Sequence, residues 1–439
     1  MKILKTWIPI SIRQRLTPTL VSSLSLIGAA YFIFRPIVEF ASRNRVDYAY
    51  HMSYLKPDMD WPAVQRLLSM FPHFLFHLLT YLAFKLFPNT TMGDAGARVA
   101  MVFYLLLALA LFWLMVRLLG KPNNYKVGAI YALVTLGLML VMPADLFTPT
   151  NLYLGYIATN VYHSPTMVIL KPFAVVLFYV AAQIFIKAGL PHSERCESTD
   201  ETCLVPTKNV YEIKSQEVSN SPITIGLIIL VAVLCTLAKP NYVMVLLPTL
   251  VVITAYSYFR RQYVNWILLL AIAVPTGIVL LCQALMFGST GGINIAPLAV
   301  LNSWASINPD APKGLILKFF LSILFQIVIY IGYFRQAVRD TYLNLAWITF
   351  GFGAAYFYLL AESGSRLDDG NFTWSAQIAL LVLFIASTIF FVQQTRLRKV
   401  SPTAVVCAVA WGLHLVSGIY WYHIHIVAAS MGDIINRKW

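Results

Sequence analysis

The first polar stretch of the chain, residues 36–98, holds residue types that acid–base chemistry needs. Asp47 follows the first apolar segment, and His51 stands four residues later, which places both on one face if this piece is helical. A carboxylate in apolar surroundings can act as a general base, because burial raises its pKa towards the working pH. The alternative is an ordinary surface acid paired with Arg43 or Arg45.

Two lysines stand at the ends of apolar runs, and each is followed by proline, at Lys171-Pro172 and Lys239-Pro240. A cation in such a place is costly and is usually paired or close to a polar cavity. An ammonium group there would bind a phosphate as a point charge. The alternative is that both side chains extend to lipid headgroups. The presence of two such pairs favours phosphate binding.

Arg366 and two histidines are further candidates for binding. Arg366 stands between two glycines, and its guanidinium fork suits a phosphate. Glu362 in the same loop is either a contact to substrate or, with the neighbouring aspartates, a salt-bridge partner of Arg366. His73 lies in the first polar stretch, and His163 lies where a loop meets an apolar segment. His163 could bond a sugar hydroxyl or a phosphate, or act as an acid, and the alternative is a capping or packing histidine.

No pattern in the sequence indicates a metal or a cofactor. Cys196, Cys203 and His192 share a loop but lack the paired spacing of a zinc site. His423 and His425 are too few for a metal site by themselves. Neither a phosphate-cradling glycine loop nor a nucleophile elbow is present. We therefore expect no metal and no cofactor in the site.

Composition sets the fold class. The 439 residues are 59% hydrophobic and 11% charged, whereas an average soluble domain has roughly 25% charged residues. Windows of about 20 nearly uncharged residues can cross a hydrocarbon core and must then be helical. The net charge of +14 sits in short connections between apolar segments, as the positive-inside bias places it, so nucleic acid is not an expected partner. We predict an all-α polytopic membrane protein with a single transmembrane domain over residues 1–439.

The apolar segments predict about eleven transmembrane helices. They cover residues 16–34, 99–117, 127–142, 167–187, 223–238, 241–258, 265–286, 315–334, 342–361, 374–393 and 402–421. Residues 71–87 are also apolar but contain His73, His77 and Lys85, so we predict an amphipathic helix in the membrane interface. The basic connections then all fall on the cytoplasmic side. If residues 71–87 spanned instead, every later connection would invert.

This topology assigns a side to each long loop. Residues 36–98 become a large first extracytoplasmic loop with juxtamembrane helices. Residues 188–222, which mix charges with serine and threonine, become a flexible cytoplasmic loop. Most of the polar candidates fall on the extracytoplasmic side of a multi-pass protein, which suggests a site that faces away from the cytoplasm.

Three features together resemble the C-type (GT-C) superfamily of polytopic membrane glycosyltransferases. One is a first span that leaves a cytoplasmic N-terminus, and another is an acid shortly after that span, in the run DYAYH at 47–51. The third is the run FPHFLFH at 71–77, which is similar to the juxtamembrane helix of such enzymes. The likeness covers the architecture of the whole chain, and motif-level similarity is confined to residues 40–90.

The resemblance implies that a sugar moves from a polyprenyl-phosphate carrier to a glycan, lipid or protein acceptor on the extracytoplasmic side, with inversion. Asp47 would be the general base. Substrate would be bound by the remaining candidates, which are His51, His73, His163, Lys171, Lys239, Arg366 and Glu362. The leaving phosphate needs a basic clamp rather than an acid catalyst. We expect a cell-envelope enzyme of a bacterial inner (plasma) membrane.

Members of the superfamily often carry two adjacent acids, but Asp47 has no acidic neighbour in sequence. Metal-independent catalysis is therefore expected, and a divalent metal is the alternative. Two other functions are open: an outer-face polysaccharide polymerase, and a transporter or flippase of lipid-linked sugars. The polymerase would have two large outer loops, and the transporter would have paired halves with interrupted helices. The sequence contains one large outer loop and no internal repeat.

Overall fold

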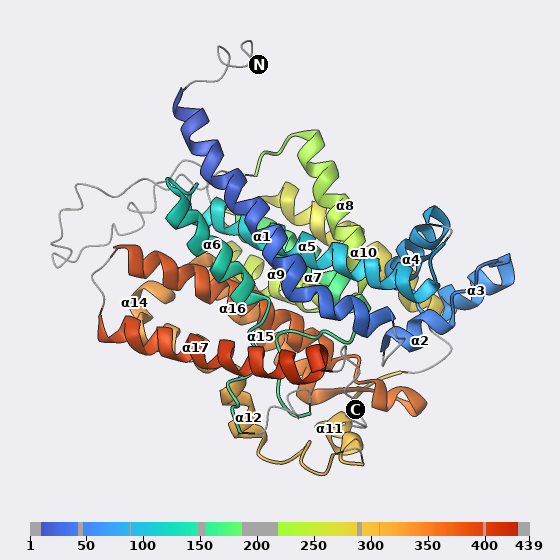
Figure 1. Cartoon of the computed structure of the whole chain (residues 1–439). Helices are drawn as coiled ribbons and strands as arrows, with labels where there is room; N and C mark the ends of the chain where they lie inside the picture. Colours follow the sequence, from blue (N-terminus) through green and yellow to red (C-terminus); the bar gives the residue numbers. More distant parts are fainter. Residues whose placement is uncertain are drawn as a thin grey trace, which may run out of the picture.

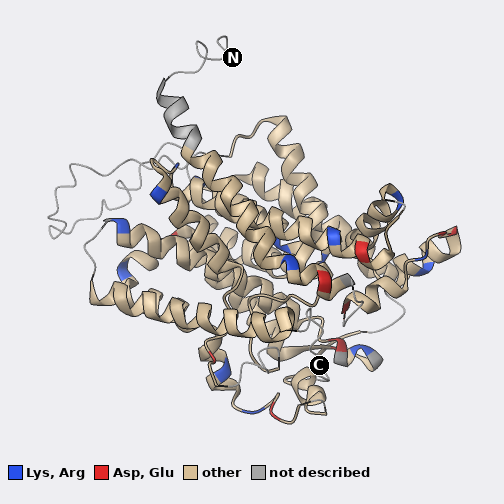
Figure 2. Ribbon diagram, viewed as in Figure 1, with Lys and Arg blue, Asp and Glu red and all other residues tan. Residues whose placement is uncertain are grey.

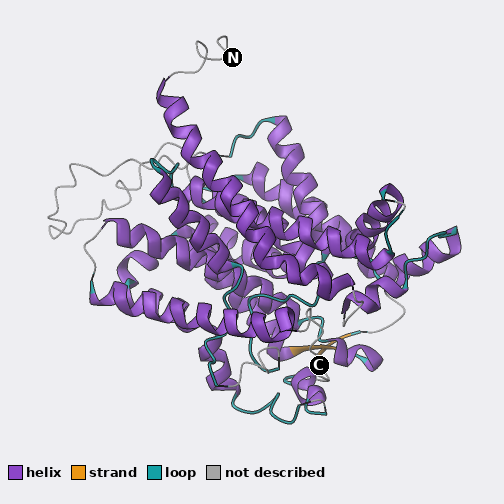
Figure 3. Cartoon of the chain, in the orientation of Figure 1, coloured by secondary structure: helices purple, strands orange, loops and turns teal. Residues whose placement is uncertain are grey.

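The computed structural model describes residues 10–42, 47–87, 89–147, 154–186, 218–287, 292–306, 308–397 and 401–428. Within these residues the protein is a bundle of α-helices with a small two-stranded sheet (Figures 1 and 3). The predicted all-α class is therefore confirmed. Most of the loop predicted over residues 188–222 lies outside the described residues, which resume at Val218.

Seven described helices are long and apolar enough to cross a membrane. They are α1 (Ile10–Ser42), α5 (Met92–Leu119), α7 (Pro165–Gln183), α9 (Asn241–Phe259), α10 (Trp266–Phe287), α16 (Thr373–Leu397) and α17 (Pro402–Tyr422). The helices α12 (Leu315–Ser322) and α13 (Leu324–Gly332) make an eighth candidate span, bent by 64° at the break between them. The chain is therefore an integral, multi-pass membrane protein.

The predicted number of spans, about eleven, is not confirmed. The helices α6 (Tyr125–Leu138) and α8 (Pro222–Ala238) have 14 and 17 residues, which is short for a span. The helix α15 (Thr341–Leu359) has 19 residues, but tyrosine, tryptophan and asparagine dilute its apolar character. Hydropathy overcounts here because residues 139–142 are apolar and buried although α6 has already ended.

The first polar stretch folds into three short helices, α2 (Asp47–Ser53), α3 (Trp61–Met70) and α4 (Leu75–Leu86). Figure 1 shows α3 and α4 projecting from one side of the bundle. Asp60 begins α3 by accepting a hydrogen bond from the Ala63 amide at 2.9 Å. Because α4 has 12 residues, it is about 18 Å long, against a hydrocarbon core about 30 Å thick. That length suits the non-spanning helix predicted over residues 71–87.

Hydrogen bonds bring the helix ends together in two groups. The guanidinium of Arg396 in α16 donates to the Leu119 carbonyl at 3.0 Å and to the Tyr131 hydroxyl at 2.7 Å. These bonds tie the end of α16 to the end of α5 and to the first turns of α6. The Asn265 amide similarly donates to the Ile184 carbonyl at 2.8 Å, which joins the start of α10 to the end of α7. The ends of α5 and α16 therefore lie beside the start of α6, and the end of α7 lies beside the start of α10.

The two ends of the bundle differ in charge (Figure 2). One end, called the basic end, carries Arg117, Lys121, Lys126, Arg260, Arg261, Arg335, Arg339 and Arg396. The other, called the site end, carries most of the described acids, which are Glu39, Asp47, Asp58, Asp60, Asp94, Asp310, Glu362 and Asp369. The basic connections identified in the sequence therefore share one end of the protein, and α2 lies at the opposite end.

A buried segment without regular structure follows α6. The carbonyls of residues 138–143 accept hydrogen bonds from four side chains, those of Asn160, Tyr162, His414 and Ser417. Lipid offers a carbonyl no partner, so irregular backbone is tolerated at membrane depth where the protein itself supplies the bonds. These four side chains replace the hydrogen bonds that a continued helix would have made.

Gly418 in α17 lets this segment pack closely. A Cβ at position 418 would lie 1.8 Å from the Leu140 carbonyl oxygen and 3.1 Å from the Met142 nitrogen. Backbone atoms cannot rotate away, so we expect Gly418→Ala to lower the free energy of unfolding in detergent by about 1–3 kcal/mol. Gly412→Ala is the matched control, because no atom lies within 4 Å of its added Cβ. Equal thermal stability of the two variants would contradict the close packing.

A small antiparallel sheet holds the loop that contains Arg366. The strand β1 (Ile293–Ile295) pairs with β2 (Leu360–Glu362), and a 3-10 helix, η4 (Gly364–Asp369), follows directly. The helix α11 (Ala299–Trp304) packs on η4. Gly370 ends η4 with a φ of 58°, and a Cβ there would lie 2.5 Å from the Trp304 ring. The remaining described elements are α14 (Phe334–Ala337) and the π-helix η5 (His423–Val427).

Candidate functional site

Asp47 lies in the first turn of α2, where the positive end of the helix dipole favours a carboxylate. Its side chain is half-buried and makes no ion pair or hydrogen bond to another described residue. Burial lowers the pKa of His163, before α7, and of Lys239, after α8, and the charge of Asp47 opposes both shifts. The fold therefore gathers three predicted site residues that are far apart in the sequence.

Lys239 is a buried cation that interacts with several members of this group. It ends α8, is 5% exposed, and donates from Nζ to Thr166 Oγ1 at 3.3 Å. The same Nζ lies 4.5 Å from the centroid of the Trp374 ring. Burial lowers the pKa of Lys239 from 10.5 to about 8. Carboxylates of three residues oppose that shift, namely Asp47, Asp369 and Glu362.

His163 lies two residues before α7 and is half-buried. Its ring centroid is 5.8 Å from that of Trp374. Burial lowers the pKa of His163, Asp47 acts in the opposite direction, and Lys239 lowers the pKa further. The imidazole is therefore neutral at pH 7, and it can both donate and accept a hydrogen bond with a hydroxyl group.

Arg366 belongs to the same group, but it already has partners. Its Nε lies 3.5 Å from Glu362 Oε1 and 3.6 Å from Asp369 Oδ2. The salt bridges that the sequence left open as an alternative are therefore formed. Arg366 still reaches the first loop, because its charge helps to lower the pKa of His73. Glu362 acts mainly as a partner of Arg366 and of Asn371, whose amide nitrogen donates to it.

The first-loop histidines differ in position. His51 Nδ1 lies 3.1 Å from His77 Nε2, and both rings are buried against Phe71. Burial lowers the pKa of His51 well below 6.5 and that of His77 to about 3, so this pair is neutral. His73 is half-buried, and burial followed by the charge of Lys239 lowers its pKa. His73 therefore borders the site, whereas His51 packs behind it.

The structure does not bring Lys171 into this group. Lys171 is 1% exposed, and its Nζ donates to Asn160 Oδ1 at 3.0 Å and lies 5.9 Å from the Tyr162 ring centroid. Asn160 in turn donates to the carbonyls of Leu138 and Val141, at 3.1 and 2.9 Å. Lys171 thus orients the amide that supports the buried segment after α6. Sequence position alone did not separate this lysine from Lys239, because both precede a proline at the end of an apolar run.

We expect Asn160→Leu to destabilise the protein more than Lys171→Met does. The leucine leaves a buried ammonium without its acceptor, which costs about 3–5 kcal/mol, and it leaves two carbonyls without their donor. The methionine removes the charge and leaves one amide oxygen unpaired, which costs about 1–3 kcal/mol. In the double variant, Lys171→Met should recover part of the loss, measured by thermal unfolding in detergent. Strictly additive losses would contradict a coupled pair.

Sequence reasoning missed several residues that border the site. Trp374 lies beneath Lys239 and beside His163, and it stands three residues after Asn371, in the run that follows the Arg366 loop. The Tyr50 hydroxyl bonds to Tyr54 and lies in the field of Asp369 and Arg366, and burial raises its pKa to about 12. Tyr50 thereby links the first loop to η4. The sequence signal that could have identified Trp374 is its place just after the polar stretch of residues 362–371.

The charges of the site nearly cancel. Among the described side chains, three carboxylates (Asp47, Glu362 and Asp369) lie near two cations (Lys239 and Arg366). Among the described residues, no group of three or more His, Cys, Asp or Glu is arranged to hold a metal ion. The arrangement can accept a proton at Asp47 and can hold an anion at Lys239.

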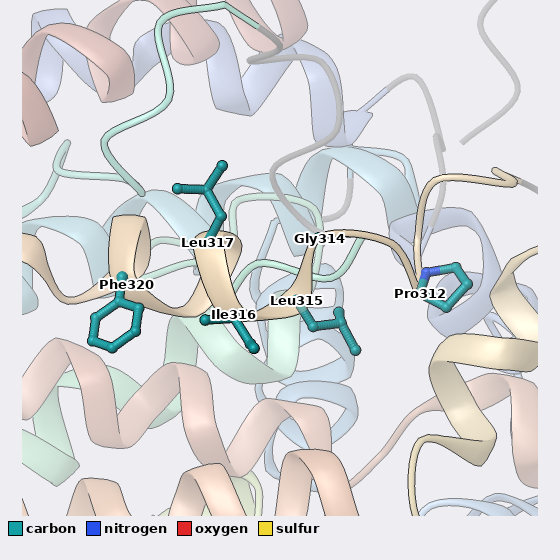
Figure 4. A pocket seen from close by; sticks show the side chains of 6 residues that line it. All are labelled: Pro312, Gly314, Leu315, Ile316, Leu317 and Phe320. Carbon is teal, nitrogen blue, oxygen red and sulfur yellow. The ribbon is translucent and has the colours of Figure 1, made fainter.

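An apolar groove lies along α12, away from these polar groups. Its volume is about 550 Å³, and Figure 4 shows its lining of Pro312, Gly314, Leu315, Ile316, Leu317 and Phe320. Ile316 and Leu317 are 77% and 64% exposed, so the groove opens on the outer surface of the bundle. Such a surface suits hydrocarbon chains of the bilayer.

Comparisons with known proteins leave the family of the chain open. No family model matches the chain, and no curated protein and no solved structure matches it either. The geometry of the site is therefore the basis for a function.

Proposed function

We propose that the chain is a glycosyltransferase that moves a sugar from a polyprenyl-phosphate carrier to an acceptor on the extracytoplasmic side of the membrane. One observation carries the proposal. A carboxylate, a neutral imidazole and a buried ammonium (Asp47, His163 and Lys239) lie within electrostatic range of one another at the end of the bundle opposite the basic connections. A base and an anion-binding cation are the two groups that transfer from a phosphate leaving group needs.

In the proposed reaction, Asp47 takes the proton of the acceptor hydroxyl while the acceptor oxygen bonds to the anomeric carbon of the sugar. The bond between that carbon and the phosphate oxygen breaks, and its electron pair leaves with the carrier phosphate. The Lys239 ammonium holds this anion, and His163 orients the hydroxyl. Arg366 would assist once the phosphate competes with Glu362 for its guanidinium.

The direction in the membrane follows from charge. Connections rich in lysine and arginine stay on the cytoplasmic side during insertion. The basic end would therefore face the cytoplasm, and the site end would face outwards. The plasma membrane of a bacterium, which handles polyprenyl-linked sugars on its outer face, is the proposed location. The carrier tail would lie along the lipid-facing surface of the bundle.

The test uses the purified full chain in vesicles that contain a polyprenyl phosphate carrying a radiolabelled sugar. A glycan, lipid or protein acceptor is added to the outside. The expected result is label in the acceptor and release of polyprenyl phosphate, both lost in Asp47→Asn. If the label stays on the carrier with every acceptor class, the transferase proposal is wrong.

A transporter or flippase of lipid-linked sugars is the second candidate. The 64° bend between α12 and α13 and the buried irregular segment after α6 favour it, because broken helices near the midplane are typical of transporters. The same vesicles distinguish the two functions. Movement of the labelled carrier to the opposite leaflet without any transfer would support the transporter and reject the enzyme.

A further inference from the structure

We propose that the turn between α9 and α10, at the basic end, binds the headgroup of an anionic phospholipid. The turn comprises residues 256–266 and lies at the opposite end of the bundle from the candidate site. This turn and its phospholipid ligand are separate from the candidate site and from its proposed function. Three observations support lipid binding: an arginine with a strained backbone, two cations without described acidic partners, and several exposed aromatic side chains in the same turn.

The backbone of the turn holds an arginine where glycine is the usual residue. The Gln262 amide donates to the Ser257 carbonyl at 2.8 Å and the Arg261 amide to the Tyr258 carbonyl at 3.1 Å. These two bonds form a Schellman motif, whose left-handed position favours glycine. Arg261 occupies that position with a φ of 54°. Residues with strained backbone often lie at functional sites, so the strain at Arg261 suggests a role for its side chain.

The charges of this turn lack acidic partners in the described part of the chain. Arg260 and Arg261 are both exposed, and neither forms an ion pair with a described carboxylate. The Arg260 guanidinium lies 5.8 Å from the Tyr256 ring centroid and has a side-chain hydrogen bond with Tyr256. Two adjacent guanidinium groups can bind a phosphodiester through paired hydrogen bonds.

Exposed aromatic side chains flank the two arginines in the sequence. The exposed fractions are 54% for Tyr256, 69% for Tyr258, 82% for Phe259, 40% for Tyr263 and 51% for Trp266. Such amphipathic rings concentrate at the headgroup level of a bilayer. A soluble phosphate would be recognised by the arginines alone, whereas a phospholipid also places its glycerol and upper acyl carbons against the rings. The surface therefore fits a membrane lipid.

An alternative explanation is that the two arginines only interact favourably with the negative end of the α9 helix dipole. The Arg261→Gly variant separates the two explanations, because it removes the backbone strain and the charge together. If lipid binding is the role, the variant should be as stable as the wild type, or more so, in lipid-free detergent. It should also bind phosphatidylglycerol roughly fivefold more weakly, since one arginine near an anionic surface contributes about that factor.

The experiment measures retained lipids by native mass spectrometry and thermal unfolding with added phosphatidylglycerol or phosphatidylcholine. Wild type should prefer phosphatidylglycerol and gain stability from it, whereas Arg261→Gly and Arg260→Gln should lose that gain. Lys121→Gln, which removes an exposed cation at the same end, should keep it. Arg260 is not strained, so Arg260→Gln keeps the test valid if the glycine variant fails to fold.

Three results would overturn the proposal. One is a fall in lipid-free stability of Arg261→Gly with phosphatidylglycerol binding unchanged. Another is equal binding of phosphatidylglycerol and phosphatidylcholine by the wild type. The third is displacement of bound phosphatidylglycerol by inorganic phosphate at equal concentration, which would make the turn a general anion site.

Discussion

Replacing Asp47 with asparagine is expected to lower the rate of sugar transfer by about 10²–10⁴-fold, the usual contribution of a positioned general base. Asparagine has the same shape but cannot take a proton from the acceptor hydroxyl. The loss should fall on kcat, with donor affinity nearly unchanged, because Lys239 rather than Asp47 would hold the phosphate. Initial rates and donor binding, measured on the same preparation, separate the two quantities.

The matched control for this variant is Asp58→Asn in the same loop. The Asp58 side chain is 99% exposed and pairs with Lys85 at 3.6 Å, away from the site. It should transfer sugar at the wild-type rate. Turnover of Asp47→Asn close to that of the wild type would remove Asp47 from the mechanism. An equal loss in both variants would point to the fold of the loop instead of a base.

Replacing Lys239 with methionine is expected to lower transfer by about 10²–10³-fold, comparable to the loss of one preorganised group that stabilises developing charge. Here the donor should also bind more weakly, because the ammonium contacts the phosphate before and after the bond breaks. Lys239→Arg keeps the cation and should retain part of both. A methionine variant with unchanged donor affinity would place the phosphate elsewhere in the site.

The pH dependence gives a second readout of Lys239. The lysine carries its proton below its pKa, which burial lowers to about 8. Donor binding should therefore be strong below pH 8 and weaken as the pH rises through about 8 and the ammonium deprotonates. Arginine stays charged throughout this range, so Lys239→Arg should abolish that alkaline loss. An identical alkaline loss in wild type and Lys239→Arg would assign it to another group.

The sequence by itself predicted the fold class, and it marked four residues that the structure places in or beside the candidate site. Low charge and long apolar windows demand membrane helices whatever the packing, which is why the all-α class is confirmed. Asp47, His163 and Lys239 were marked as polar side chains close to the end of an apolar run, and Arg366 by its place between two glycines. The fold then brings Asp47, His163 and Lys239 close enough for the charge of Asp47 to act on the other two.

Only the tertiary structure determined which residues each charged side chain contacts. Lys171 and Lys239 share a following proline and a place at the end of an apolar run, yet packing placed one on Asn160 and the other over Trp374. The number of spans also depended on packing, since the buried segment after α6 is as apolar as a membrane helix but is held by side chains from α17 and from residues 160–162. Hydropathy and spacing are local properties, whereas the electrostatic environment of a buried side chain is set by elements that lie far away in the sequence.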